Sequence, residues 1–300
     1  MNKKIAIQGI KGCNHHIAAM EYFHNRDLDI VDCFSFTQLA KLVRDNKDII
    51  GIMAIENTIA GSILQNYRLI LENGLKITGE YKLRIKHALA VIPGVKLSDI
   101  REVNSHPMAL MQCEDFLEKL SDVKLVETDD TAGSAKWIKD NNLLDHASIC
   151  PEVAAKIYGL DVLVNGIETN KKNYTRFLIL SRDEEDSQEC SEIQTLDEAQ
   201  AYNDGQTHGI RQAIAIKNKA SLVFSLSHKS GSLSRVLSVL SFYDMNLTMI
   251  QSIPIIGQEW EYQFYINLIF DDYNRYRGAV DAIKPLTKEF KILGEYQEAK

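Results

Sequence analysis

The chain has 300 residues, of which 45% are hydrophobic and 25% charged, and its net charge at neutral pH is −7. This composition excludes collagen, low-complexity polymers and disordered tails, and the length allows about two domains. The negative charge argues against a broad surface for nucleic acid or an anionic membrane, so any anionic ligand must be held locally. No segment approaches the ~20 apolar residues of a membrane span, and we expect a cytoplasmic protein.

The cysteine and histidine residues form no pattern typical of a disulfide framework or a metal site. The five cysteines are odd in number, widely spaced and without a CxxC pair, which favours reduced thiols. The eight histidines include no HExxH motif. Residues 9–12 (GIKG) follow a strand-like run without completing the GxGxxG fingerprint, so a plain strand-to-helix turn is the alternative interpretation. The sequence therefore predicts neither a metal nor another cofactor.

Short apolar runs alternate with helical periodicity through residue 180, a pattern typical of parallel sheets covered by helices. One helix is predicted over 107–120, where apolar residues recur at three- and four-residue spacing. Another is predicted over 151–158, with proline in its first turn and Gly159 at its end. Both begin directly after a strand. The predicted strands of this half are 4–8, 49–55, 87–92, 102–104, 146–150 and 176–180.

An acidic stretch over residues 183–209 has few large apolar residues and no sustained period, which predicts a linker or a surface insertion. A different pattern follows it. The predicted elements are a strand over 220–226, a helix over 232–243, strands over 246–255 and 261–270, a helix over 275–285 and a strand over 289–296. This βαββαβ order is that of a ferredoxin-like fold.

Four polar clusters lie at strand ends or helix starts in the first half, where α/β proteins usually build a binding site. They fall within residues 55–62, 105–112, 129–131 and 173–177. Helix N-termini offer free N–H groups and partial positive charge, which suit carboxylate ligands. A serine or threonine before a helix is more often a cap than a catalyst, and that alternative stays open for Ser62 and Thr131 taken singly.

Several segments resemble the signature segments of prephenate dehydratases. They are AIENTIAGS, SHPMALMQC, ICPEVAAKIYGL and NYTRFLIL, of which the TRF triplet is the most specific. The later segment LVFSLSHKSGSLSRVLSVLSFYDMNLTMIQSIP resembles the ACT regulatory domain that follows the catalytic domain in that family. The resemblance covers nearly the whole chain. It implies an enzyme of phenylalanine biosynthesis that removes water and carbon dioxide from prephenate to give phenylpyruvate, without a cofactor.

The resemblance also implies an architecture, two periplasmic-binding-protein-like α/β lobes around a cleft followed by a ferredoxin-like ACT domain. We expect a catalytic domain over residues 1–183, with lobes formed by 1–80 plus 167–183 and by 81–166. A linker over 184–212 and the ACT domain over 213–300 then complete the chain. Two alternatives are arogenate dehydratase, which performs the same elimination on an amino-group substrate, and a non-catalytic amino-acid-binding sensor. The TRF triplet opposes the sensor, because a binder does not need that donor.

Prephenate carries two carboxylates and a ring hydroxyl, and its elimination yields an aromatic ring, so the enzyme must chiefly orient the dianion and assist the leaving hydroxyl. The resemblance assigns that assistance to Thr175, as an oriented donor inside a network. For Arg176 both carboxylate binding and a structural salt bridge are open, because strand alternation turns it away from Thr175. The other residues that the resemblance assigns to substrate are Asn57, Ser105, Gln112, Asp129, Thr131 and Phe177. Turn closure, a helix start and a solvent-facing position are the structural alternatives for the first three of these.

In ACT domains of this family, phenylalanine binds between subunits, near the start of the first helix and the end of the second strand. The corresponding residues are Gly231, Ser232, Leu233, Gln251 and Ser252. The family usually reads Glu-Ser-Arg-Pro where residues 251–254 read QSIP, so an edge strand ending at a proline is an equal interpretation. These replacements leave open whether phenylalanine regulates the enzyme. We expect prephenate as substrate, phenylalanine as the candidate effector, a homodimer or homotetramer, and no nucleic-acid or membrane partner.

Overall fold

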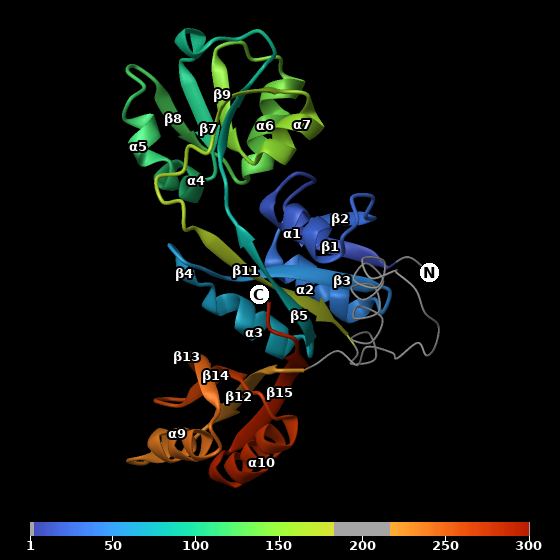
Figure 1. Ribbon diagram of the computed structural model, residues 1–300, viewed down its shortest axis with the longest axis vertical. Coiled ribbons are helices and arrows are strands. Elements are labelled where there is room, and N and C mark those ends of the chain that lie inside the picture. Colours follow the sequence, from blue (N-terminus) through green and yellow to red (C-terminus); the bar gives the residue numbers. More distant parts are fainter. Residues whose placement is uncertain (1–2, 183–216, 300) are drawn as a thin grey trace, which may run out of the picture. The chain divides into compact units, whose positions relative to one another are not determined.

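The computed structural model describes residues 3–182 and 217–299, which form three β-sheets with their helices (Figure 1). The chain divides into two compact units, one of Met1–Leu42, Asp48–Ile63 and Tyr81–Phe177, the other of Val43–Lys47, Leu64–Glu80 and Leu178–Lys300. The acidic stretch predicted to be a linker lies outside the described residues. None of the described helices is long and apolar enough to cross a membrane.

The first sheet has the strand order β2-β1-β3-β11-β5, with β4 paired to β3. Strand β1 (Lys4–Gln8) lies parallel to β2 (Ile30–Cys33) and to β3 (Ile49–Asn57). Strand β11 (Tyr174–Ser181) enters this sheet from far along the chain and lies between β3 and β5 (Lys76–Arg84). The chain thereby places the TRF segment beside the end of β3. The remaining elements here are β4 (Gly61–Ser62), α1 (Asn14–Tyr22), α2 (Phe36–Asp45) and α3 (Leu64–Glu72).

The second sheet has the order β10-β6-β9-β7-β8 and is mixed. Strand β7 (Glu102–Ser105) pairs in parallel with β8 (Lys124–Glu127) and β9 (His146–Cys150). Strand β6 (Ala88–Val91) pairs antiparallel with β9 and with β10 (Asp161–Asn165). The prediction of parallel strands is therefore wrong for β6, and β10, which was not predicted, is antiparallel to it. Every residue of β6 is buried, and a strand buried on both faces has the same apolar pattern in either direction.

The predicted helix over 107–120 is two helices, α4 (Pro107–Gln112) and α5 (Glu114–Leu117). The break is at Cys113, whose φ of −113° and ψ of 19° lie outside the helical range. Because Cys113 is itself buried, the apolar periodicity continues through the break and did not reveal it. The second predicted helix is α7 (Glu152–Tyr158), which ends at Gly159 in the left-handed conformation, as expected. Helix α6 (Thr131–Asp140) and the short turn η1 (Leu97–Asp99) complete this region.

The third sheet is antiparallel, with the order β13-β14-β12-β15. Its elements follow the βαββαβ order that the sequence predicted. They are β12 (Lys219–Ser225), α9 (Ser232–Phe242), β13 (Asn246–Pro254), β14 (Tyr262–Ile269), α10 (Tyr273–Ile283), the turn η2 (Lys284–Leu286) and β15 (Glu289–Tyr296). Both helices pack on one face of the sheet, and the core there includes Leu222, Phe224, Val236, Leu240, Ile266 and Val280.

The other face of the third sheet is buried along its central strands, β12 and β14. Lys219 Nζ lies 2.8 Å from Glu80 Oε1 on β5, and the two side chains are 2% and 0% exposed. The ring of Tyr265 on β14 lies 5.5 Å from that of Tyr67 on α3. All four residues belong to the second compact unit. Within that unit the central strands are therefore covered on both faces, by α9 and α10 on one and by α3 and β5 on the other, whereas edge strand β13 is mostly exposed on that second face.

Candidate active site

Asn57, the last residue of β3, turns its side-chain oxygen back onto its own chain. Its Oδ1 accepts hydrogen bonds from the backbone N–H groups of Ile59 and Ala60, each at 2.9 Å. Backbone N–H groups can only donate, so these two bonds identify the oxygen of the amide. Asn57 closes a turn, which was one alternative for it, and its Nδ2 is left to donate elsewhere.

The amide nitrogen of Asn57 donates to the first residues of β11. It lies 2.9 Å from Thr175 Oγ1 and 2.7 Å from Asn173 Oδ1. Thr175 is 9% exposed, and its oxygen already accepts this hydrogen bond. Within residues 3–182 and 217–299, no acceptor for the Thr175 hydroxyl proton lies within hydrogen-bond distance. The geometry therefore leaves that proton available to a ligand.

The same network continues from Asn173 to the end of α4. Asn173 Nδ2 donates to Gln112 Oε1 at 2.9 Å, and His87 Nε2 lies 3.0 Å from that same oxygen. The two N–H groups of Gln112 Nε2 have no hydrogen-bond partner in the described part of the chain. Together Asn57, Thr175, Asn173, Gln112 and His87 form what we call the amide network. Sequence analysis identified its other members but not His87, whose only signal was a polar residue at a strand start.

Arg176 and Phe177 follow Thr175 on β11 and have different surroundings. The Arg176 Nε lies 3.8 Å from Glu56 Oε2, which is the structural salt bridge that the sequence left open. The Phe177 side chain is buried, and its ring meets that of His15 edge-on at 5.0 Å between centroids. Burial lowers the pKa of His15 to about 3. Phe177 thus belongs to the core, and a substrate role for either residue stays a prediction.

The structure does not bring Ser105, Asp129 and Thr131 into the amide network. Ser105 is fully buried and its hydroxyl donates to the Ile149 carbonyl at 2.6 Å, across strands β7 and β9. Asp129 is exposed, whereas Asp130 Oδ2 accepts from the N–H of Gly133 and caps α6. Burial raises the pKa of Asp130. Thr131 is the first residue of α6 and is buried. The predicted substrate contacts of Ser105, Asp129 and Thr131 stay predictions.

The predicted effector residues lie at one end of the third sheet. Gly231 precedes α9 with a φ of 75°, a left-handed conformation that glycine adopts without strain. Gln263 of β14 pairs with Ser225 at the end of β12 and with Ile253 at the end of β13. The loop that enters α9 and the segment with Gln251 and Ser252 therefore share this end.

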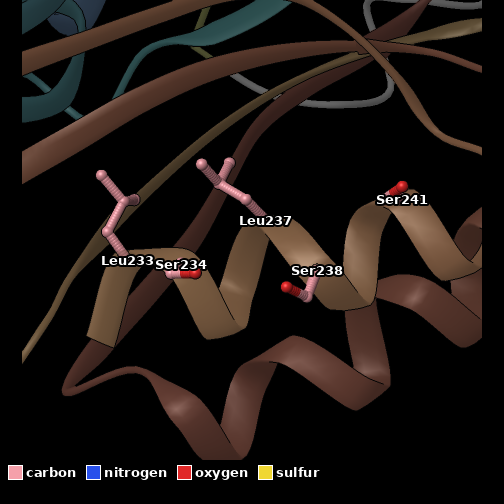
Figure 2. Close-up of a pocket in the computed structure, with 5 residues that line it drawn as sticks. All are labelled: Leu233, Ser234, Leu237, Ser238 and Ser241. Carbon is pink, nitrogen blue, oxygen red and sulfur yellow. The ribbon is translucent and has the colours of Figure 1, made fainter. Parts of the chain in front are cut away.

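A shallow hollow lies on the surface of α9. It is lined by Leu233, Ser234, Leu237, Ser238 and Ser241 (Figure 2). Figure 2 shows the two leucine side chains pointing to the same side of the helix, and both are half-buried, whereas the three serines are exposed. Leu233 alone of these lining residues is among the predicted effector residues.

Thiols and possible metal ligands are scattered in the described chain. Cys13, Cys33, Cys113 and Cys150 are buried free thiols, and the fifth cysteine, Cys190, lies outside the described residues. Burial raises the pKa of Cys13, Cys113 and Cys150 to about 12. In residues 3–182 and 217–299, no three His, Cys, Asp or Glu side chains are grouped to hold a metal ion.

Comparison with known proteins identifies the family. The sequence profile of prephenate dehydratases matches residues 5–185. The chain belongs to the prephenate dehydratase family. This family of hydro-lyases includes the bifunctional chorismate mutase/prephenate dehydratase of Buchnera aphidicola, 30% identical over 298 residues, 97% of this chain and 70% of that protein. It also includes the chloroplastic arogenate dehydratase/prephenate dehydratase 2 of Arabidopsis thaliana, 34% identical over 306 residues, 98% of this chain and 72% of that protein.

Solved structures similar to this family member extend over nearly its whole length. The prephenate dehydratase of Arthrobacter aurescens, in complex with L-Phe, has a TM-score of 0.79 at 24% identity and covers 99% of this chain and 90% of its own. The Staphylococcus aureus prephenate dehydratase has a TM-score of 0.76 at 21% identity, with 98% and 100% covered. GqqA, described as a novel type of quorum-quenching acylase, has a TM-score of 0.81 at 25% identity, with 99% and 98% covered. The mixed α/β fold is thus that of prephenate dehydratases.

Proposed function

We propose that this chain converts prephenate to phenylpyruvate, water and carbon dioxide. The observation that carries the proposal is the hydrogen bond from Asn57 Nδ2 to Thr175 Oγ1 at 2.9 Å. It directs the Thr175 proton away from Asn57, so the hydroxyl can donate that proton to a ligand. A hydroxyl that accepts a hydrogen bond is also polarised into a stronger donor. Thr175 is then suited to hydrogen-bond the departing hydroxyl of prephenate.

The reaction balances without a further reagent. Prephenate enters as a dianion, the bond between its ring and the ring carboxylate breaks, and carbon dioxide leaves. The electron pair of that bond passes into the ring as the carbon–oxygen bond to the ring hydroxyl breaks, which forms the aromatic phenylpyruvate monoanion. The departing hydroxide takes up one proton, which comes from the solvent in the overall balance, and becomes water. Because aromatisation drives the step, the protein chiefly orients the substrate and stabilises charge on the departing oxygen.

The residues proposed to hold the substrate differ in how well the geometry supports them. Gln112 has the best support, because its amide N–H groups are uncommitted in the described chain and can donate to a carboxylate. Asn57 acts mainly on Thr175. The remaining proposed contacts, from the family resemblance, are Ser105, Asp129, Thr131, Arg176 and Phe177.

GqqA is described as an acylase, and the surroundings of Thr175 in the described chain can be compared with what acyl transfer needs. Acyl transfer needs a nucleophile with a base beside it that accepts the nucleophile's proton. In the described chain the Thr175 hydroxyl contacts only the amide of Asn57, which donates to it. The network is therefore suited to proton donation and not to nucleophilic attack.

We propose that the βαββαβ part is an ACT domain that binds phenylalanine between two copies of the chain, in a homodimer or homotetramer. The proposed contacts are Gly231, Ser232, Leu233, Gln251 and Ser252, whose segments share one end of the third sheet. The L-Phe complex of the Arthrobacter aurescens enzyme supports this assignment. An effector acts only by binding one arrangement of the enzyme more tightly than another. Added phenylalanine should therefore change the turnover of the full chain and its elution volume in size-exclusion chromatography.

The test of the catalytic proposal is turnover of prephenate by the purified chain at neutral pH, followed as the alkaline absorbance of phenylpyruvate. Thr175→Ala should lower kcat by about 10²-fold or more, because a positioned proton donor typically contributes that much. Thr175→Ser keeps a hydroxyl and should retain most of the activity, while circular dichroism shows that both variants are folded.

Three outcomes of this assay would contradict the proposal in different ways. A Thr175→Ala enzyme with near-normal kcat would remove Thr175 from the mechanism. Turnover of arogenate to phenylalanine, with prephenate unchanged, would replace the substrate. A folded chain that binds prephenate or phenylalanine but converts neither prephenate nor arogenate would be a sensor.

A further inference from the structure

His87 lies at the far end of the amide network, one residue before β6. Its side chain is 2% exposed, and its Nε2 lies 3.0 Å from Gln112 Oε1. Its backbone N–H donates to Glu168 Oε2 at 3.1 Å, and its carbonyl accepts from the N–H of Ile167. The residue is thus held by its backbone while its ring reaches the network.

The direction of every hydrogen bond in the network follows from one end of it. The N–H groups of Ile59 and Ala60 identify Asn57 Oδ1 as the acceptor, so Asn57 Nδ2 donates to Asn173 Oδ1. The nitrogen of Asn173 must then donate to Gln112. The group of Gln112 that accepts from Asn173 is its oxygen, and His87 Nε2 faces that same oxygen. His87 Nε2 therefore carries a hydrogen.

The environment of His87 keeps its ring neutral. With Nε2 protonated, the neutral ring has a lone pair on Nδ1, which is buried with no hydrogen-bond partner in the described chain. A proton on Nδ1 would bury a charge there without an acceptor, and burial lowers the pKa of His87 accordingly. The hydrogen bond to Gln112 and the charge of Glu168, which accepts from the backbone N–H of His87, raise this pKa but offset burial only in part. Of the possible forms of the His87 ring, the neutral tautomer with its hydrogen on Nε2 is the one that fits these surroundings.

We propose that His87 is a positioning residue for the dehydration, which it serves through Gln112. Two donors, His87 Nε2 and Asn173 Nδ2, hold the Gln112 oxygen inside the network and leave the Gln112 nitrogen with its two N–H groups for the anionic substrate. Without His87 one of the two donors is lost, and a rotated Gln112 would present an acceptor to an anion. This role rests on the proposed function and adds a residue that does not itself touch the substrate.

The test compares two amide replacements of different length. His87→Gln places an N–H donor near the position of Nε2 and should keep kcat/KM within about threefold of the parent. His87→Asn is too short to reach Gln112 and should lower kcat/KM by about 10- to 10²-fold, the loss expected when a substrate-positioning group is misplaced. In a Gln112→Ala background, His87→Asn should cause no further loss, because residues that act as one unit are not additive. Val91→Ala, a buried change on β6 outside the network, controls for lost stability.

Two kinetic results would overturn the proposal, namely a folded His87→Asn enzyme with normal kcat/KM and a loss that is equally large in the Gln112→Ala background. Nitrogen NMR of the ¹⁵N-histidine-labelled full chain tests the geometry without any turnover. It should show His87 as the Nε2–H tautomer, with its titration shifted to lower pH than that of an exposed histidine, assigned by its absence in His87→Gln. The Nδ1–H tautomer would overturn the proposal even if His87→Asn fails to fold. A parent chain without dehydratase activity would instead refute the proposed function, and the NMR result would still decide how Gln112 is held.

Discussion

At the scale of single residues, the character of the Thr175 hydroxyl depends on Asn57, which lies 118 positions away in the sequence. The amide of Asn57 is oriented by two backbone N–H groups of its own turn, so a local turn determines which way a distant hydroxyl donates. The orientation of the Asn57 amide also determines which groups of Gln112 and His87 donate and which accept, through Asn173. Three amides, a hydroxyl and a histidine that burial favours in its neutral form make up this network, and neutral groups keep the same hydrogen-bonding pattern over a wide range of pH.

A second buried histidine, His15, should make the folded chain sensitive to acid. Its folded-state pKa is about 3, against 6.5 for an exposed histidine, so the unfolded chain binds more protons between these values. The stability due to neutral His15 is therefore complete above pH 6.5 and is lost progressively as the pH falls toward 3. In the parent, the Ala54 N–H donates to His15 Nε2 at 3.3 Å. The glutamine of His15→Gln keeps an acceptor for this N–H, but its side chain does not titrate.

The measurement is urea unfolding of the parent and of His15→Gln at several pH values between about 4.5 and 6.5. The parent should lose stability more steeply on acidification, by up to about 1.4 kcal/mol per pH unit, the limit for one proton. Equal slopes for the two proteins would show that His15 titrates normally in the folded chain.

At the scale of elements, β15 and β5 approach so closely that one position accepts only glycine. A Cβ added to Gly294 would overlap the carbonyl oxygen and the Cβ of Ile77, and backbone atoms there cannot rotate away. The close approach coincides with a shift of register between β12 and β15 near Ser221. Strand β5 was not predicted, because its sequence KITGEYKLR mixes charged and apolar residues without strict alternation. Its burial comes from the third sheet that covers it.

Gly294→Ala should therefore destabilise the chain by about 1–3 kcal/mol or more, the cost of overpacking a site that cannot relax. The matched control is Gly133→Ala in α6, where the added Cβ would meet its nearest neighbour at 3.4 Å. Gly133 lies in the first turn of α6, and in a helix this change is neutral or stabilising, by up to about 1 kcal/mol. Chemical denaturation of both variants measures the difference, and equal stabilities would mean that β15 can move away from Ile77.

At the scale of the whole molecule, the second compact unit combines α3, part of β5 and the βαββαβ segment around one sheet. The buried pair of Lys219 and Glu80 belongs to this unit and joins segments 139 positions apart in the sequence. Burial of a charge is costly, and each of these two charges is compensated by the other. The βαββαβ segment therefore contributes to the stability of β5, because it supplies the lysine that pairs with Glu80.

Lys219→Met should destabilise the full chain by about 3–5 kcal/mol, since it leaves the Glu80 carboxylate buried without its ammonium partner. The double variant Glu80→Gln with Lys219→Met removes both charges and should recover much of that loss. Urea unfolding of the two variants and the parent gives the comparison. If Lys219→Met were as stable as the parent, the charge of Lys219 would not be what compensates Glu80.

Much of the local structure could be predicted from the sequence, for reasons that are themselves local. Strands 4–8, 146–150 and 289–296 have the bounds that the apolar patterns indicated, and α7 ends at the glycine that the pattern marked. The break at Cys113 was not predictable, because this residue is buried and continues the apolar pattern of the helix. The antiparallel direction of β6 was not predictable, because all its residues are buried and its apolar pattern is the same in either direction. The site was predictable as far as its residue types, and Asn57, Gln112 and Thr175 do share one network.

The sequence by itself determined the alternation of strands and helices, the βαββαβ order and, through the TRF and related segments, the family, because these depend on neighbours along the chain. Tertiary structure decided which groups meet. The insertion of β11 between β3 and β5 brings Thr175 to the amide of Asn57, and the approach of β12 to β5 gives Glu80 its lysine. A hydrogen bond or a buried ion pair needs two partners within about 3 Å, and only the folded chain sets that distance.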